Sequence, residues 1–173
     1  NALVWEKTVF DPSVDLKYFA DREIEKVYIS HGHADHFRQA SELRTKGAKV
    51  LAPKKEAIFV ENPSINVRAM FSWAALPSPM VTRFFLGTPC KVDAYTEEEM
   101  GSPVTAVSLP GHSVGHHGFL LPNRIFFSGD ALWPKEMWNF SPLPYMIDLN
   151  QTRQSLRQIK ELDYTWLIPA HGN

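Results

Sequence analysis

The chain has 173 residues, of which 44% are hydrophobic and 21% charged, and its formal net charge is −1. This length and composition predict one globular domain over residues 1–173 and exclude a disordered chain. The balanced charge gives no reason to expect nucleic acid or an anionic membrane as partner. Cys90, the single cysteine, excludes an internal disulfide, and this usage is typical of a reducing, cytoplasmic compartment.

The first part of the chain predicts alternating strands and helices. The β-branched and aromatic run at 26–30 is typical of a buried strand. Gly47 is a plausible C-cap for the helix predicted over 36–46. We expect strands over 4–10, 26–30 and 48–53 and helices over 15–25, 36–46 and 55–60. No apolar run approaches the ~20 residues of a membrane helix, and Glu6 and Lys7 interrupt the first one, so neither a span nor a signal peptide is expected.

Three later segments share one form, an apolar run that stops at a polar cluster. They are residues 104–112, 124–130 and 165–172. Between the last two, residues 150–162 place Leu156, Ile159 and Leu162 on one face of a predicted helix. The whole chain is therefore predicted to be of the α/β class, without a linker, a low-complexity segment or an internal repeat.

Histidine and aspartate residues fall directly after the predicted strands. Five of the seven histidines do so, and the set of strand-end residues is His31, His33, Asp35, His36, His112, Asp130 and His171. Open α/β sheets place ligand sites where the carboxyl ends of their strands meet, so we expect these side chains at one edge of a sheet.

The hexapeptide HGHADH, residues 31–36, predicts metal binding. Imidazole nitrogen and carboxylate oxygen are natural ligands of Zn²⁺ and of neighbouring divalent ions. His31 and His33 are two residues apart, so in an extended stretch both side chains leave on the same side. Asp35 and His36 then face a second point, and Asp130 has two oxygens with which to bridge two cations. A site for two metal ions follows from this pattern.

Each residue alone also has an ordinary structural interpretation. An isolated histidine such as His116 or His117 is more often a hydrogen-bonded residue than a ligand. Asp130 is a plausible turn residue after Gly129, and His171 a plausible loop residue. The hexapeptide together with three further strand-end positions favours the metal site over these readings.

Four motifs, HGHADH, PGHSVGH, FFSGD and PAHG, occur in this order over residues 31–171 and resemble those of the metallo-β-lactamase superfamily, glyoxalase II-like members included. The resemblance implies a four-layer αβ/βα sandwich with two mixed β-sheets. It implies two divalent ions, most often Zn²⁺ with Fe or Mn as alternatives. One would be held by His31, His33, His112 and Asp130, the other by Asp35, His36, Asp130 and His171.

The same resemblance implies roles for further residues. A metal-bound hydroxide would attack an electrophilic carbon or phosphorus, with Asp35 and Asp130 as the catalytic carboxylates. His116 matches a histidine that usually supports the ligands by hydrogen bonding. Asp11 lies where the family commonly has an Asp-x-Gly turn beneath the metal loop, although Pro12 and Ser13 depart from that pattern. His117 is given no role.

The expected function is a dinuclear metal-dependent hydrolase of a thioester, lactone or related ester. The aromatic segments 69–85 and 131–148 are candidate pocket walls for an apolar or acyl group, or else core or interface. The chain ends soon after His171, so we expect a near-minimal module without the helical domain of glyoxalase II. Alternative functions are an iron-dependent persulfide dioxygenase, a small phosphodiesterase and a non-catalytic binding protein. We expect a small molecule as partner, and neither nucleic acid nor a membrane. We also expect the protein to be a monomer or homodimer.

Overall fold

The structure is a computed structural model that describes residues 2–65, 87–99, 102–132 and 148–171. Within these residues the strands are β1 (Leu3–Trp5), β2 (Thr8–Phe10), β3 (Lys26–Tyr28), β4 (Lys49–Ala52), β5 (Ala94–Tyr95), β6 (Thr105–Ser108), β7 (His117–Leu120), β8 (Ile125–Gly129) and β9 (Trp166–Pro169). The α-helices are α1 (Ala40–Thr45), α2 (Ala57–Glu61) and α6 (Leu149–Glu161), with 3-10 turns at Leu16–Phe19, Ala34–His36 and Thr96–Glu98.

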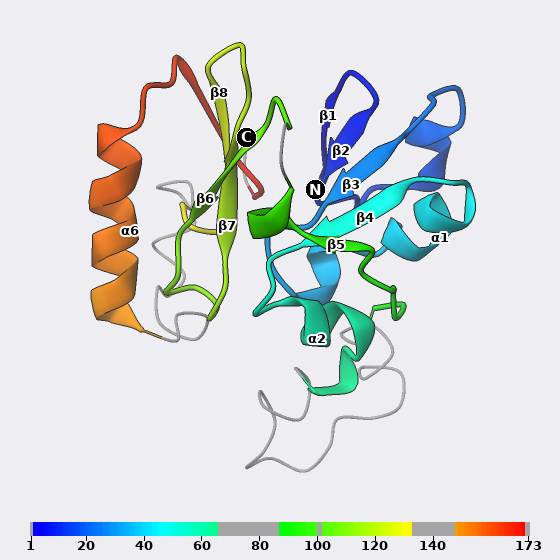
Figure 1. The fold of residues 1–173 in the computed structure, drawn as a ribbon, viewed down its shortest axis with the longest axis horizontal. Coiled ribbons are helices and arrows are strands. Elements are labelled where there is room, and N and C mark those ends of the chain that lie inside the picture. The colour runs from blue at the N-terminus through cyan, green and yellow to red at the C-terminus, as the bar shows by residue number, and fades with distance from the viewer. Residues whose placement is uncertain (1, 66–86, 100–101, 133–147, 172–173) are drawn as a thin grey trace.

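The strands form two mixed sheets. The first has the order β1-β2-β3-β4-β5, in which only the β1–β2 pair is antiparallel. The second has the order β6-β7-β8-β9, in which only the β8–β9 pair is parallel. Figure 1 shows α1 and α2 beside the first sheet and α6 outside the second.

Strand alternation explains why four layers form. Successive side chains of a strand point to opposite faces, so Val27 of β3 packs toward α1 and α2 while Tyr28 packs between the sheets. In β8, Phe127 faces the space between the sheets and Phe126 packs with Ile159 of α6. Three cores result, one between the sheets and one under each helical layer, which confirms the predicted four-layer αβ/βα sandwich.

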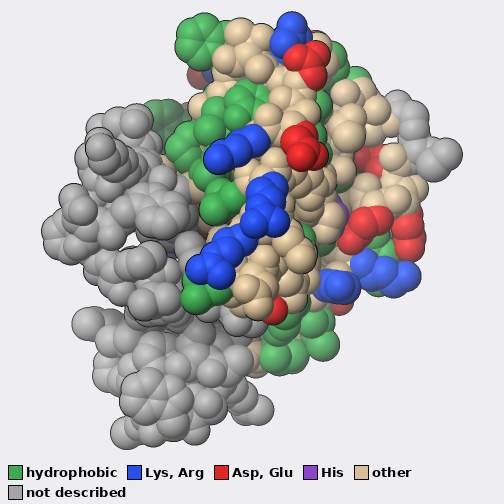
Figure 2. Space-filling view, turned by 90° about the vertical axis from the view of Figure 1, so that its left-hand side faces the viewer, with side chains coloured by type: hydrophobic (Ala, Val, Ile, Leu, Met, Phe, Trp, Pro, Cys, Tyr) green, Lys and Arg blue, Asp and Glu red, His purple; other side chains and the backbone are tan. Residues whose placement is uncertain are grey.

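Helix α6 has the face expected from its sequence. Ile159 is buried against the second sheet, and Leu156 packs beside it. The opposite side carries exposed Arg153, Arg157 and Lys160, and Figure 2 looks onto this side of the molecule, where basic side chains stand out. Among the described residues, no helix is long and apolar enough to cross a membrane.

The structure departs from several sequence predictions. The helix expected over 36–46 is only α1 (Ala40–Thr45), because His36 belongs to the 3-10 turn Ala34–His36. Residues 4–10 form the β1–β2 hairpin rather than one strand, because Glu6 adopts a left-handed φ of 51° and turns the chain. Residues 15–25 contain only the 3-10 turn Leu16–Phe19, capped by Asp15, since Phe19 is the only buried side chain of that turn. Strand β7 was not expected, because its His-Gly start has the composition of a loop.

Candidate metal centre

Four chain segments meet at the ends of strands from both sheets, not at the edge of one sheet as the sequence suggested. Residues 31–36 follow β3 of the first sheet, whereas His112 follows β6, Asp130 follows β8 and His171 follows β9 of the second. The site therefore lies where the two sheets meet. All seven predicted ligands are in this one place, in overlapping groups whose donor atoms lie within 4.8 Å of one another.

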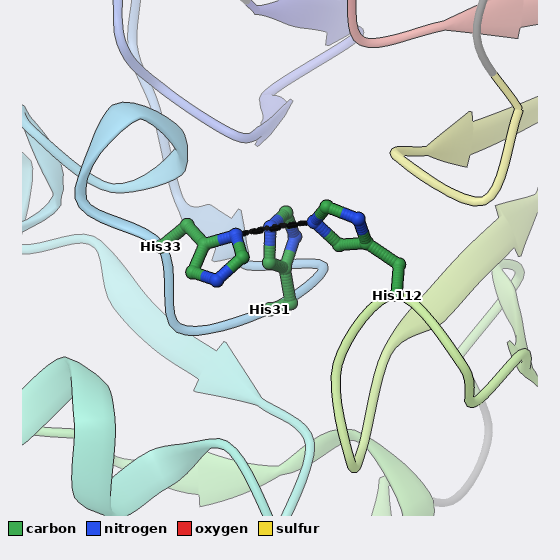
Figure 3. A group of neighbouring side chains, drawn as sticks. All are labelled: His31, His33 and His112. Carbon is green, nitrogen blue, oxygen red and sulfur yellow. Dashed lines mark hydrogen bonds between the residues drawn. The ribbon is translucent and has the colours of Figure 1, made fainter. Parts of the chain in front are cut away.

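Three histidines form the first group, shown in Figure 3. His31 Nε2 lies 2.9 Å from His33 Nδ1, and His112 Nε2 lies 3.2 Å and 3.1 Å from these two atoms. The rings come from two loops, one after β3 and one after β6, and point their nitrogens toward a common centre. The two-residue spacing of His31 and His33 does bring both side chains to one side, as predicted.

Asp35, His36 and His171 form the second group. Asp35 Oδ2 lies 3.2 Å from His171 Nε2 and 3.5 Å from His36 Nε2, and the two histidine Nε2 atoms are 3.4 Å apart. Asp35 is the most open member, with its side chain 46% exposed, while His36 is completely buried. This group has one side toward solvent.

Asp130 lies between the two groups. Its Oδ2 is 3.5 Å from His112 Nε2 and 3.4 Å from His36 Nε2, and its Oδ1 is 3.4 Å from His171 Nε2. The side chain is only 4% exposed. One carboxylate thus faces ligands of both groups, which is the geometry that a bridging role requires.

The electrostatics of the two groups differ. Burial lowers the pKa of His31 well below its ordinary value, and it lowers the pKa of His112 to about 3. Hydrogen bonds to Asp130 and Asp35 raise the pKa of His171 to about 9. Burial disfavours a charge on His36, yet Asp130 and Asp11 hold its pKa well above the usual range. The first group is therefore made of neutral imidazoles and the second of paired charges.

The residues fit divalent cations. Bonds of about 2.0–2.1 Å in a tetrahedral zinc site place neighbouring nitrogens roughly 3.3 Å apart, close to the 2.9–3.2 Å found among His31, His33 and His112. Neutral imidazoles keep a lone pair for the metal. The carboxylates of Asp35 and Asp130 have lowered pKa values despite burial, because His171 and His36 stabilise their charge. The three-histidine group therefore offers neutral nitrogens and the two aspartates offer anionic oxygens, as such ions prefer. A cation at the second group would displace the protons of His36 and His171.

Asp11 lies beneath the hexapeptide loop. Its carboxylate accepts hydrogen bonds from Ser30 N–H at 2.7 Å, from Ser30 Oγ at 2.6 Å and from His36 Nδ1 at 2.8 Å. The residue is fully buried, and its φ of 47° is a left-handed value that Asp tolerates better than most side chains. Asp11 thus lies beneath the hexapeptide loop, as the resemblance implied, although Pro12 and Ser13 depart from the pattern; its three hydrogen bonds were not predicted.

His116 and His117 play no direct part in either ligand group. His116 Nε2 accepts the backbone N–H of Asp130 at 3.0 Å, so this buried ring contacts the segment that carries the Asp130 carboxylate. The contact requires Gly129, because a Cβ there would lie 2.7 Å from His116 Nε2. His117 Nδ1 contacts the carbonyl oxygen of Gly115 at 2.7 Å, which anchors the start of β7.

Sequence reasoning missed Glu56. It is 1% exposed, and its carboxylate contacts both loops that carry the three-histidine group. In the sequence it follows two lysines before a short apolar run, so it has the pattern of an ordinary surface helix residue. The predicted pocket segments 69–85 and 131–148 fall almost entirely outside the described residues, which include only 131, 132 and 148 of them.

Comparison with known proteins identifies related sequences. Residues 3–171 match the family model of the metallo-beta-lactamase superfamily. A curated relative, an atrochrysone carboxyl ACP thioesterase of Aspergillus fumigatus, is 28% identical over 169 residues, which are 97% of this chain and 43% of the relative. The chain thus spans less than half the length of this relative.

Solved structures share the fold. TTHA1623 in a di-iron-bound form has a TM-score of 0.69 and 24% identity, over 100% of this chain and 87% of that one. The B3 metallo-beta-lactamase BLEG-1 has a TM-score of 0.69 and 18% identity, over 99% and 85%. The archaeal protein ST1585 of Sulfolobus tokodaii has a TM-score of 0.66 and 18% identity, over 96% and 70%.

Proposed function

The chain belongs to the metallo-beta-lactamase superfamily, and from this membership and the site geometry we propose that it is a dinuclear metal-dependent hydrolase of activated acyl compounds, thioesters first. Lactones and related esters are the next substrates of this class. The supporting observation is Asp130, whose two oxygens face the three-histidine group and the Asp35–His36–His171 group at once. We propose one divalent cation at each group, most readily Zn²⁺.

The seven residues have separate parts in this proposal. His31, His33 and His112 would hold one cation, Asp35, His36 and His171 would hold the other, and Asp130 lies between the two groups. Two such cations supply water activation at neutral pH and stabilisation of negative charge on the oxygens of the reacting group. Asp35, the most exposed member of its group, faces the solvent side and is placed to orient a water or to accept its proton.

The carboxylates favour a substrate with a good leaving group. Asp35 and Asp130 both have lowered pKa values, so at neutral pH both are ionised and have no proton to donate. A thiolate, with a thiol pKa of about 8.5, leaves without prior protonation, whereas an amine leaving from an amide needs an acid. The thioesterase relative supports the same choice.

The test is hydrolysis by the chain loaded with Zn²⁺ or with Fe²⁺. A panel of acyl thioesters, lactones and phosphodiesters is compared, and Asp35→Asn is paired with Asp21→Asn, a matched change at an exposed aspartate. We expect thioester turnover, with kcat/KM at least about tenfold lower in Asp35→Asn and unchanged in Asp21→Asn. Metal-loaded protein that hydrolyses no member of the panel would contradict the proposal, and oxygen uptake with a persulfide would favour the iron dioxygenase.

A further inference from the structure

Glu56 uses its side chain in an unusual way for its position. It is the N-cap residue of α2, yet it makes no side-chain hydrogen bond to that helix. Instead its Oε2 accepts Gly32 N–H at 2.9 Å, and its Oε1 accepts Ser113 Oγ–H at 2.8 Å and Gly115 N–H at 2.6 Å. One carboxylate therefore joins two loops that are some 80 residues apart in the sequence.

The donors stand next to metal-ligand candidates. Gly32 lies between His31 and His33, and Ser113 directly follows His112. Both loops also approach α2 too closely for side chains at their glycines. A Cβ at Gly32 would lie 2.5 Å from Phe59 Cβ, and a Cβ at Gly115 would lie 2.7 Å from Lys55 Cβ. The backbone of both loops at Gly32 and Gly115 therefore packs directly against the segment that carries Glu56.

Burial of the Glu56 carboxylate costs free energy that its hydrogen bonds must offset. Glu56 is 1% exposed, and in the described part of the chain no basic side chain lies within ion-pair distance of it. A buried carboxylate is costly unless hydrogen bonds compensate the lost water. Here three donors do so, and each of them is fixed to a loop that carries histidines. Moving either loop would break bonds to a charged acceptor, which are stronger than neutral ones.

We propose that Glu56 is a positioning residue for the three-histidine group: its carboxylate ties the loop of His31 and His33 to the loop of His112. The inference rests on the proposed metal centre. It also predicts an asymmetry, because the donors Gly32 and Ser113 adjoin His31, His33 and His112 in the chain, whereas none of the three donors adjoins Asp35, His36 or His171. Substitution of Glu56 should lower the metal affinity of the three-histidine group and leave that of the Asp35–His36–His171 group unchanged.

The experiment loads the full chain with ¹¹³Cd²⁺ and records its NMR resonances together with stepwise affinities from chelator competition. Glu56→Gln keeps the side-chain size but replaces one acceptor oxygen with an NH₂ group, which then faces Gly32 N–H or the donors at Ser113 and Gly115. The matched control is Glu99→Gln, a change at a carboxylate with a 9% exposed side chain that contacts Lys26 and Tyr28, away from both loops.

We expect two cadmium resonances in the wild type. In Glu56→Gln one resonance should shift or broaden and one affinity should fall about 10- to 100-fold, as is typical when a group that supports metal ligands is lost. Glu99→Gln should leave both affinities within about twofold of the wild type. A Glu56→Gln protein with both sites unchanged, or with both weakened equally, would overturn the inference.

Two further outcomes are separable. If the wild type fails to bind two ions, the proposed metal centre is wrong. This result differs from one in which two ions bind but their affinities do not change in Glu56→Gln, which overturns only the role of Glu56. If Glu56→Gln does not fold, Ser113→Ala carries the test, because it removes only one of the three hydrogen bonds. We then expect the same resonance to move and that affinity to fall about 3- to 10-fold; unchanged binding would overturn the role of Glu56.

Discussion

Asp11→Asn tests how the structure holds His36 in place. The carboxylate accepts three hydrogen bonds, two from Ser30 and one from His36 Nδ1. The substitution keeps the size of the side chain, and asparagine tolerates the left-handed φ of 47° as well as aspartate does, so no backbone strain is added. The change is therefore confined to one acceptor atom and one charge.

The size of the effect follows from the contacts. If the new NH₂ group replaces Oδ2, it faces His36 Nδ1 and favours the tautomer that carries its proton on Nε2, the atom directed at the second ligand group. If it replaces Oδ1, it opposes the Ser30 N–H across 2.7 Å. Either way a bond beneath the ligand loop is lost, and such losses cost about 10- to 100-fold in metal affinity, or about 1.4–2.7 kcal/mol.

The assay is competition between the metal-stripped protein and a chromophoric chelator for Zn²⁺ at pH 7. Asp15→Asn is the matched control, since that exposed aspartate caps the turn at Leu16–Phe19 and pairs with Lys17. We expect one of two affinities to fall in Asp11→Asn and neither in Asp15→Asn. Asp11→Asn affinities within twofold of the wild type would refute the reasoning that His36 depends on this carboxylate.

Three further predictions concern packing and titration. Gly118→Ala puts a Cβ 2.6 Å from Phe126 Cζ, so the free energy of unfolding measured in urea should fall by about 1–3 kcal/mol. Adding Phe126→Leu should recover part of this loss, and an unchanged unfolding midpoint in Gly118→Ala would contradict the close packing. Burial raises the pKa of the Cys90 thiol from 9.0 to about 11. At pH 8 its reaction with a disulfide reagent should therefore be about a hundredfold slower than in the urea-unfolded chain, and the rate should increase with pH up to about 11. Equal rates in the folded and unfolded chain would show that the thiol is accessible and its pKa not raised. Hydrogen bonds from the N–H groups of Gln151 and Asn150 lower the pKa of Asp148, so its stabilisation is fully present above pH 3.8 and is lost as the pH falls through the lower folded-state pKa. Asp148→Ala should therefore lower the melting temperature more at pH 7 than at pH 2.5, and an equal loss at both would contradict this.

Local sequence patterns predicted which histidine and aspartate side chains would come together, because each pattern lies within a short stretch of the chain. The spacing of His31 and His33 and the strand-end positions of Asp130 and His171 depend only on period-two geometry and on where apolar runs stop. The structure brings these side chains together at the meeting point of two sheets. Their assignment to two cations stays a prediction, since it depends on bound metal.

Glu56 could not be predicted because its role is set entirely by tertiary contacts. Nothing near it in the sequence shows that Gly32 and Gly115 will approach it from two other loops. The β1–β2 hairpin was missed for a different reason: Glu6 and Lys7 make its turn without the glycine or asparagine that usually marks one. Strand β7 was missed because Gly118 fits a strand only where Phe126 closes over it, and that contact is not visible locally.

Metal stoichiometry tests the central claim most directly. The protein is purified without added metal, dialysed against excess Zn²⁺ and then against metal-free buffer, and its Zn and Fe contents are measured per chain before and after loading, beside Asp130→Ala. The account predicts about two divalent ions per loaded wild-type chain and fewer in the variant, because Asp130 faces both ligand groups. A wild-type chain that retains no metal, or a variant that retains as much as the wild type, would contradict it.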